Sequence, residues 1–437
     1  MWAVGVLALS MTGSVPPEPL REYRGAWVAT VDNIDWPSKP GLPVDKQKQE
    51  LRAIVATAEE VGLNMLVFQV RTSADALYPS EIEPSSWFLT GEQGAKIGWD
   101  PLEFMIEECH RSGIELHAWI NPFRAGHPSQ KGAHASSHVS RSGNAGVVEY
   151  GKFLWMDPGD AALRKRTIAV AKDIVSRYDV DGLHIDDYFY PYPTGNDFPD
   201  SASYGRYRAE GGSLDRESWR RENVDTLVRE LGSVVHSTKP WVKFGISPFG
   251  IYRPGVPEGI KAGVDQYAQL YADARKWLNE GWCDYMVPQL YWKQSSSGQP
   301  FEPLLQWWQG ENRQSVSLLA GHFTSQCGPS FGNWPASEIG GQIHIVRNRS
   351  AHGSVHFSMR AIQGDWNGVA KKLKTFYRLP ALPPPHPRPP KDTGPERWRL
   401  WLDGETWRLS SPAAVPVTTG TVVRSVDAYG RISPIQR

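Results

Sequence analysis

Eight short apolar segments, each followed by a longer segment with helical spacing, dominate the chain between residues 21 and 379. The expected strands cover residues 23–31, 64–71, 114–122, 182–188, 242–250, 284–292, 315–323 and 354–362. The expected helices cover residues 45–61, 100–112, 160–178, 216–237, 266–280, 301–312, 337–348 and 366–377. This alternation predicts an α/β fold, a (β/α)8 TIM barrel. A doubly wound open sheet is the alternative, but no Gly-rich phosphate loop follows the first strand.

The barrel is expected over residues 21–379, with other material on both sides. Residues 380–395 predict a proline-rich linker, a semi-rigid spacer, and residues 396–437 a small β-rich tail with a hairpin at Asp403–Gly404. Residues 1–20 contain an apolar run like that of a secretory signal, although no basic residue precedes it. We therefore expect a secreted or periplasmic protein of the cell envelope. No run is long enough to predict an integral membrane segment.

Composition narrows the class of partner. Lys plus Arg and Asp plus Glu both number 47, so the net charge gives no reason to expect a nucleic-acid partner. The chain has 19 Trp and 16 Tyr, whose flat rings suit the apolar faces of sugars, so a polysaccharide is the expected partner. Three widely spaced cysteines and the absence of an HExxH motif predict neither a zinc cluster nor another metal or cofactor. The sequence does not indicate an oligomeric state.

The stretch "VDGLHIDDYFYP", residues 180–191, carries the strongest chemical signal. Side chains alternate along a strand, so His184 and Asp186 should face the barrel axis, with Asp187 opening the following loop. Two adjacent carboxylates in a closed pocket raise each other's cost of ionisation, so one can keep a proton near neutral pH. A carboxylate beside a carboxylic acid is what glycoside hydrolysis uses. Asp186 and Asp187 are therefore the predicted catalytic residues.

Long segments follow several strands, and barrel enzymes build their sites from the loops at that end. Polar and aromatic residues there are the expected substrate-binding residues: Asp32, Arg71, Asp75, Tyr78, Trp119, Asn121, Arg124, His184, Tyr188, Tyr252, Gln289, Tyr291, Trp292 and Arg360. The fifth and sixth strands end without a carboxylate, so the source of the acid stays open. It is Asp187 or a loop carboxylate, for which the candidates are Asp32, Asp35, Asp75 and Glu258.

Six stretches together resemble the glycosyl-hydrolase-like family 10 barrels of bacterial envelopes: "REYRGAWVATVDNIDWPS", "NMLVFQVRTSADALYPS", "HAWINPFR", "VDGLHIDDYFYP", "FGISPFGIYR" and "VPQLYW". That family includes hydrolases of peptidoglycan glycan strands stripped of their stem peptides. The resemblance implies an exported glycosidase acting on β-1,4-linked N-acetylamino-sugar polymers.

The mechanism stays open between two resemblances. The tandem aspartates look like the pair of hexosaminidase-type barrels, in which Asp186 would orient the substrate's acetamido group and Asp187 would donate the proton. The "GLHID" strand also looks like the nucleophile strand of the α-amylase superfamily, which would make Asp186 a covalent nucleophile. We favour the first. A non-catalytic glycan-binding barrel is the alternative outside the enzyme class.

Overall fold

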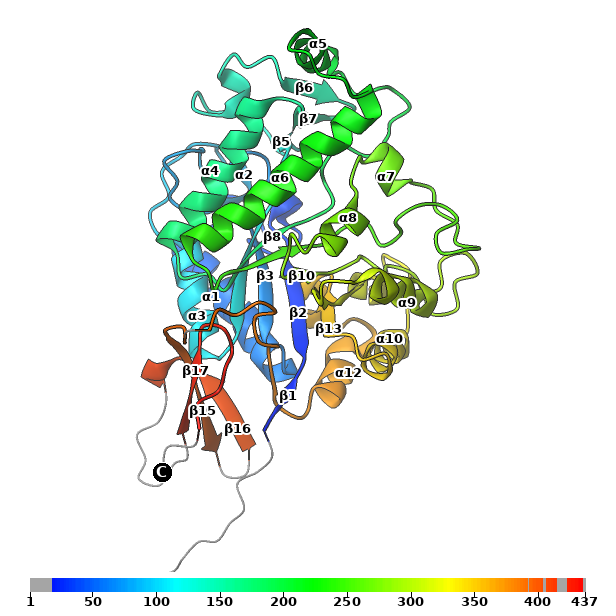
Figure 1. The fold of residues 1–437 in the computed structure, drawn as a ribbon. Helices are drawn as coiled ribbons and strands as arrows, with labels where there is room; N and C mark the ends of the chain where they lie inside the picture. Colours follow the sequence, from blue (N-terminus) through cyan, green and yellow to red (C-terminus); the bar gives the residue numbers. More distant parts are fainter. Residues whose placement is uncertain (1–17, 392, 404–405, 415–422, 435–437) are drawn as a thin grey trace, which may run out of the picture.

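The computed structural model describes residues 18–391, 393–403, 406–414 and 423–434, so most of the signal-like segment lies outside the described residues. Its central feature is a ring of parallel strands (Figure 1). In chain order these are β2 (Tyr23–Val28), β3 (Met65–Arg71), β4 (Glu115–Ile120), β8 (Gly182–Ile185), β9 (Lys243–Ile246), β10 (Tyr285–Met286), β11 (Ser317–Leu318), β12 (Ala320–His322) and β13 (Gly353–His356). The predicted TIM barrel is confirmed.

The ring closes through the seventh strand of the barrel, which is split into β11 and β12 at Leu319. β11 pairs with β10 on one side, and β12 pairs with β13 on the other. The backbone N–H of Leu319 donates to the carbonyl of Met286 at 2.9 Å, so hydrogen bonding continues across the break. Closure leaves the barrel without a free sheet edge.

Helices cover the outside of the ring (Figure 1). They are α1 (Val44–Val61), α3 (Pro101–Arg111), α4 (Ala161–Arg177), α6 (Arg216–Thr238), α7 (Gln266–Gln269), α8 (Ala274–Asn279), α9 (Phe301–Glu311), α10 (Ala336–Asn348) and α12 (Val369–Phe376). Asp100 and Asp160 cap α3 and α4 by accepting hydrogen bonds from their first turns. The helix expected over 266–280 is interrupted between α7 and α8, because Tyr271 has a φ of 52°. In the described part of the chain, every helix is too short or too polar to span a bilayer.

The long segments after the strands build a cap over the carboxyl end of the barrel (top of Figure 1). It contains α2 (Trp87–Thr90), α5 (Ser201–Ala209) and a small antiparallel sheet of β5 (Arg124–Gly126), β6 (Val147–Tyr150) and β7 (Phe153–Met156). The short helix α11 (Met359–Gln363) follows the eighth strand. Below the cap, inward side chains fill the barrel: the Tyr285 hydroxyl hydrogen-bonds with Nδ1 of His117 at 2.7 Å and with Nδ1 of His184 at 3.0 Å.

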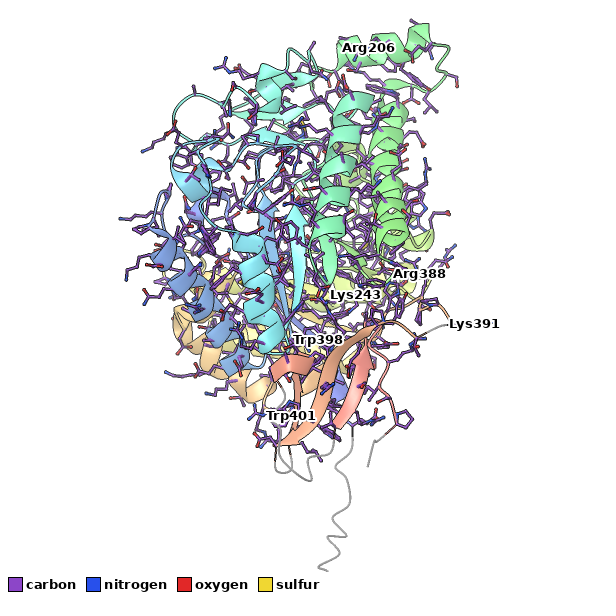
Figure 2. The ribbon with its side chains drawn as sticks, turned by 90° about the vertical axis from the view of Figure 1, so that its left-hand side faces the viewer. Arg206, Lys243, Arg388, Lys391, Trp398 and Trp401 are labelled. Atoms are coloured by element: carbon purple, nitrogen blue, oxygen red, sulfur yellow. The ribbon has the colours of Figure 1, made fainter. Side chains whose placement is uncertain are left out.

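The tail forms a three-stranded antiparallel sheet at the opposite, amino-terminal face of the barrel (Figures 1 and 2). Its strands are β15 (Glu396–Asp403), β16 (Thr406–Ser410) and β17 (Val423–Asp427). The expected pairing of β15 with β16 is present, and Trp398 and Trp407 are buried, which makes them packing residues. Arg397 joins the tail to the barrel by an ion pair of 2.8 Å with Asp181, just before β8.

The proline-rich segment, predicted to be a semi-rigid spacer, lies against the barrel where it is described. β14 (Ala381–Leu382) pairs in parallel with β1 (Leu20–Arg21), and Arg388 donates to Asp284 at 2.7 Å and to the carbonyl of Cys283 at 3.1 Å. Side chains between the prolines thus supply hydrogen bonds that proline nitrogens cannot donate. Where it is described, the segment is fastened along the base of the barrel.

Candidate active site

A cavity of about 230 Å³ opens at the carboxyl end of the strands. Aromatic side chains form much of its wall, and Asp186 and Asp187 are the only carboxylates among the described residues that line it. The lining consists of Trp27, Ala29, Val31, Ile34, Gln69, Trp119, Arg124, Asp186, Asp187, Tyr188, Tyr192, Ser247, Gln289, Tyr291 and Phe357. A ring-lined cavity with few charged groups suits a sugar, whose faces are apolar and whose edges carry hydroxyls.

Asp186 is the first residue after β8 and is 3% exposed. Its Oδ2 accepts a hydrogen bond from Nδ2 of Asn121. Two further donors fix Asn121, since Nε2 of Gln69 lies 2.5 Å and a guanidinium nitrogen of Arg124 lies 2.9 Å from its Oδ1. The carboxylate therefore rests on a chain of polar contacts that begins on neighbouring strands.

Asp187 is buried as well, but a different residue holds it. Its Oδ2 accepts a hydrogen bond from the Tyr192 hydroxyl, and Tyr192 comes from the same segment after β8. The tandem aspartates thus have separate supports.

Burial and the neighbouring charge of Asp187 raise the pKa of Asp186 to about 7, against the opposing effect of Arg124. Burial also raises the pKa of Asp187, although hydrogen bonds from Tyr192 and Gln289 oppose the rise. Two such close groups titrate as a unit. Because both pKa values are raised, the pair holds a shared proton near neutral pH.

Arg124 supplies the positive charge beside the pair. Its guanidinium lies 4.9 Å from the centre of the Tyr188 ring, and its Nε donates to the carbonyl of Thr72 at 3.0 Å. The side chain is 4% exposed, so it is fixed rather than free to move into solvent. It limits how far the pKa values of both carboxylates rise.

The structure gathers about half of the predicted substrate-binding residues around this cavity. Trp119, Arg124, Tyr188, Gln289 and Tyr291 line it. Asn121 supports Asp186 from behind, and His184 lies one layer deeper, where it hydrogen-bonds with Ser247 of the cavity floor at 3.0 Å. Burial lowers the pKa of His184, so its imidazole is neutral.

Other predicted residues lie outside the lining because internal partners occupy them. Arg71 forms a buried ion pair with Glu83 at 2.7 Å, and Asp75 accepts from Thr72 and Ser73. Tyr78 is buried with its ring against Tyr178.

Four more of the predicted residues are also absent from the lining. Asp32 is exposed, and the Tyr252 hydroxyl donates to Asp273 at 3.1 Å. Trp292 packs against Phe249, and Arg360 donates to the carbonyl of Ile34 at 3.3 Å.

The alternative loop acids do not reach the cavity either. Asp35 accepts from the Ser358 hydroxyl and from the backbone N–H of Arg360, each at 2.7 Å, and so fastens the first strand end to the eighth. Glu258 is exposed on the loop after β9. Within the described lining, the carboxyl chemistry belongs to Asp186 and Asp187 alone.

Sequence reasoning missed three ring residues of the wall: Trp27, Tyr192 and Phe357. Trp27 shares the inward face of β2 with Tyr23, so the alternation of side chains along the strand could have predicted its direction. Phe357 follows β13, and Tyr192 lies in the loop after β8, where no periodicity indicates direction.

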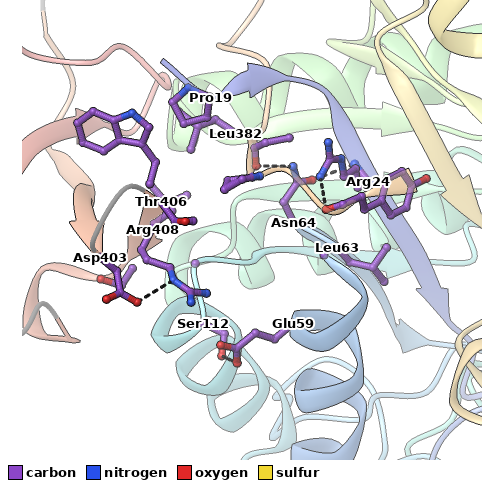
Figure 3. Close-up of a pocket in the computed structure, with 18 of the residues that line it drawn as sticks. Pro19, Arg24, Glu59, Leu63, Asn64, Ser112, Leu382, Asp403, Thr406 and Arg408 are labelled. Atoms are coloured by element: carbon purple, nitrogen blue, oxygen red, sulfur yellow. Dashed lines mark hydrogen bonds and ion pairs between the residues drawn. The ribbon is translucent and has the colours of Figure 1, made fainter. Parts of the chain in front are cut away.

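A larger groove, of about 660 Å³, lies at the other end of the molecule between the tail and the barrel base (Figure 3). Within it, Arg408 pairs with Asp403 at 3.4 Å, and Ser112 donates to Glu59 at 2.9 Å. It is a crevice between docked surfaces, remote from the carboxylate pair.

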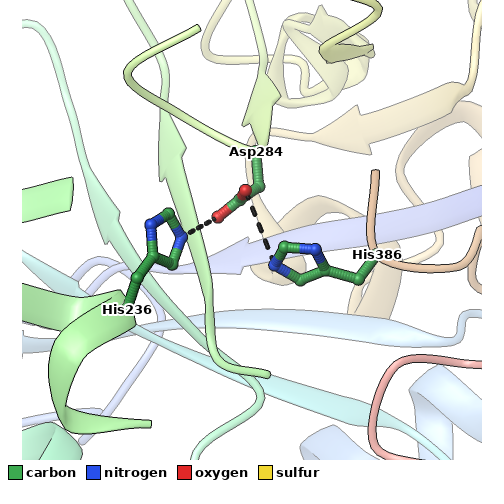
Figure 4. A group of neighbouring side chains, drawn as sticks. All are labelled: His236, Asp284 and His386. Carbon is green, nitrogen blue, oxygen red and sulfur yellow. Dashed lines mark hydrogen bonds and ion pairs between the residues drawn. The ribbon is translucent and has the colours of Figure 1, made fainter. Parts of the chain in front are cut away.

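A histidine–aspartate cluster lies on the amino-terminal side too (Figure 4). His236 and His386 flank Asp284 at 2.7 Å and 3.5 Å. These are the only described side chains grouped closely enough to share a metal ion. Arg388 and the backbone N–H of Phe244 also donate to this carboxylate, so the arginine ion pair and these hydrogen bonds account for the group.

An eight-stranded barrel with a buried carboxylate pair in a ring-lined cavity at its carboxyl end has the architecture of a glycosidase-type barrel. The same fold appears in the PgaB (BpsB) glycoside hydrolase domain from Bordetella bronchiseptica and in the catalytic domain of β-amylase from Paenibacillus polymyxa. Each has a TM-score of 0.54 and 11% sequence identity, over 82% of this chain and 98% of the other. At that identity the likeness shows the fold alone.

The chain belongs to the glycosyl hydrolase-like 10 family, whose model matches residues 22–333. It is 38% identical to glycosyl hydrolase YngK of Bacillus subtilis (strain 168) over 400 residues, which is 88% of this chain and 77% of the relative. It is 33% identical to glycosyl hydrolase DigH of Escherichia coli (strain K12) over 319 residues, which is 68% of this chain and 72% of the relative. The expected family is confirmed.

Proposed function

We propose that the protein hydrolyses glycosidic bonds in N-acetylamino-sugar polymers, with peptidoglycan glycan strands as the substrate, and that Asp186 and Asp187 are the catalytic residues. One observation carries the proposal: the cavity's carboxylates are a buried pair whose pKa values are both raised. A pair that holds one proton supplies both the acid and the base of glycoside hydrolysis. Family membership supports the reaction class.

In the proposed mechanism, the substrate moves the shared proton. In the free protein, the two carboxyl groups share one proton. An acetamido N–H that donates to Asp186 stabilises the charged form of that carboxylate and so transfers the proton to Asp187. Asp187 then protonates the leaving oxygen, while Asp186 holds the acetamido group so that its carbonyl oxygen attacks the anomeric carbon. Water opens the resulting ring, and Asp187 takes back a proton.

We further propose that the protein works outside the cytoplasm, where its polymer substrate lies. The apolar run near the start of the sequence supports this location. Fusing residues 1–30 to a reporter enzyme that folds only after export tests it, and a reporter that stays in the cytoplasm contradicts it.

The substrate assignment is tested by mass analysis of products from three polymers: peptidoglycan strands stripped of peptides, chitooligosaccharides and an α-glucan. Cleavage of the first two and not the third supports the proposal. Cleavage of the α-glucan alone contradicts it, and release from none favours a glycan-binding barrel. A thiazoline inhibitor should bind tightly if the acetamido group is the nucleophile. A trapped glycosyl–Asp186 adduct overturns that route and favours Asp186 as nucleophile.

A further inference from the structure

We infer that the indole N–H of Trp119 is the donor that recognises the carbonyl oxygen of the substrate's acetamido group, while Asp186 accepts the N–H of the same group. This inference rests on the proposed function, and it assigns the residue that distinguishes an acetamido sugar from a sugar without that group.

The observation is an unused donor in the wall of the cavity. Trp119 is 6% exposed and lines the cavity, yet its Nε1 is buried without a hydrogen-bond partner. Buried N–H groups are nearly always paired, because an unpaired one gives up its hydrogen bonds to water without gaining a replacement. Fully buried tryptophans elsewhere in the barrel follow that rule, since the indoles of Trp27, Trp36, Trp155, Trp277 and Trp308 all donate to an internal acceptor.

The unused N–H lies beside the reacting carboxylate. It lowers the pKa of Asp186, so the two groups are close, but it does not meet the geometry of a hydrogen bond to it. The donor of Trp119 and the acceptor of Asp186 are thus neighbours on the same cavity wall. The hydrogen bond from Asn121 to Oδ2 of Asp186 holds the acceptor of the two in place.

A secondary amide matches such a neighbouring donor and acceptor, because it carries one N–H and one carbonyl. A sugar with a 2-acetamido group can satisfy both protein groups together, because its carbonyl accepts from Trp119 while its N–H donates to Asp186. The unpaired donor then becomes a source of specificity, since a ligand without the carbonyl leaves it unsatisfied.

The test is Trp119→Phe, which keeps an aromatic ring and removes the N–H. Its matched control is Trp36→Phe, since the Trp36 indole is buried outside the cavity and donates to the carbonyl of Gln47 at 3.0 Å. Dissociation constants are measured by titration calorimetry for the N-acetylglucosamine tetramer and for cellotetraose. Both variants and their parent carry Asp187→Asn so that the glycan stays intact. KM and kcat are measured separately, in chains that keep Asp187.

Trp119→Phe should raise Kd for the acetamido tetramer about five- to tenfold, the effect of one neutral hydrogen bond, and leave Kd for cellotetraose unchanged. It should lower Tm less than Trp36→Phe does, because both changes remove buried ring volume but only Trp36→Phe also removes an internal hydrogen bond. Trp36→Phe should lower Tm and leave both Kd values unchanged. In NMR spectra, the Trp119 indole N–H resonance of the parent is identified by its absence from the spectrum of Trp119→Phe. This resonance should shift when the tetramer is added to the parent.

Equal affinity of Trp119→Phe and its parent for the acetamido tetramer overturns the inference while the proposed function stands. Equal losses for the tetramer and for cellotetraose also overturn it, because they show a general packing role. If the parent neither binds the tetramer nor cleaves any acetamido polymer, the proposed function itself fails.

Discussion

The side-chain amide of Asn121 donates a hydrogen bond to Oδ2 of Asp186, across the boundary between β4 and β8. Because Gln69 and Arg124 both donate to the other end of Asn121, this amide cannot turn away from the carboxylate. Asp186 is therefore positioned by groups fixed on three separate segments of the barrel.

Replacing Asn121 with alanine should lower kcat by about 10- to 100-fold, the usual cost of losing a residue that orients a reacting group. KM should change less, since Asn121 is not part of the described cavity lining. Steady-state kinetics on chitooligosaccharides measure both. A loss confined to KM would contradict the positioning role.

Removing one charge of the pair should change how stability depends on pH. The pKa of Asp186 is about 7 in the folded protein and near its ordinary value of 3.8 in the unfolded chain. The folded state thus binds more protons between these values, so this group's contribution makes stability fall as pH rises from about 4 to 7. In thermal melts between about pH 4 and 7, the Tm of the wild type should fall relative to the Tm of Asp186→Asn as the pH rises. A constant difference in Tm would contradict the raised pKa.

The Tyr192 hydroxyl donates to Asp187 and thereby holds down the pKa of that carboxyl. Tyr192→Phe removes the donor, so the pKa of Asp187 should rise and the limb of the pH–rate profile that reports the pair should move to higher pH. The measurement is kcat/KM against pH. Tyr150→Phe is a matched control, because its hydroxyl donates to the carbonyl of Asn196 at 2.8 Å, outside the lining. A profile that shifts equally in both variants would argue against a specific effect.

Fastening of the tail should matter for stability and not for catalysis. Arg397 is 11% exposed and pairs with Asp179 and Asp181 at the amino-terminal face, far from the carboxylate pair. Arg397→Ala should reduce the free energy of unfolding by about 2–4 kcal/mol, because it leaves the buried Asp181 with less compensation.

Arg399→Ala is the control, since its side chain and that of its partner Glu396 are 40% and 35% exposed and their ion pair should contribute under about 1 kcal/mol. Denaturant unfolding and specific activity are measured on both variants. A loss of activity in folded Arg397→Ala protein would contradict the separation between the tail and the site.

The fold could be predicted because its signals are local. Eight apolar segments, each with its own helix and caps, restrict the chain to few topologies, and the structure has all eight. The interruption at Tyr271 could not be predicted, because it depends on partners far along the chain: Arg220 donates to its hydroxyl, and Tyr190 packs against its ring.

The candidate site was predictable where strand alternation still governs direction. Trp119, Gln289 and Asp186 follow directly from it, whereas Asp187 was predicted from its place next to Asp186. Arg71 also lies at a strand end, but it forms an ion pair with Glu83 that no local sequence pattern predicts. Loop residues such as Tyr192 depend on the path of the loop, and only the folded chain shows that path.

Whether Asp186 and Asp187 together hydrolyse the glycan is measured by the release of reducing ends from peptidoglycan strands stripped of peptides. The wild type should release them, and Asp186→Asn and Asp187→Asn should each reduce the rate by at least about 10³-fold. Asp35→Asn is the matched control, because Asp35 is a carboxylate with a pKa raised to about 6 outside the cavity lining, and it should keep most of the activity. Full activity in either aspartate variant of the pair, or no release by the wild type, would contradict the account.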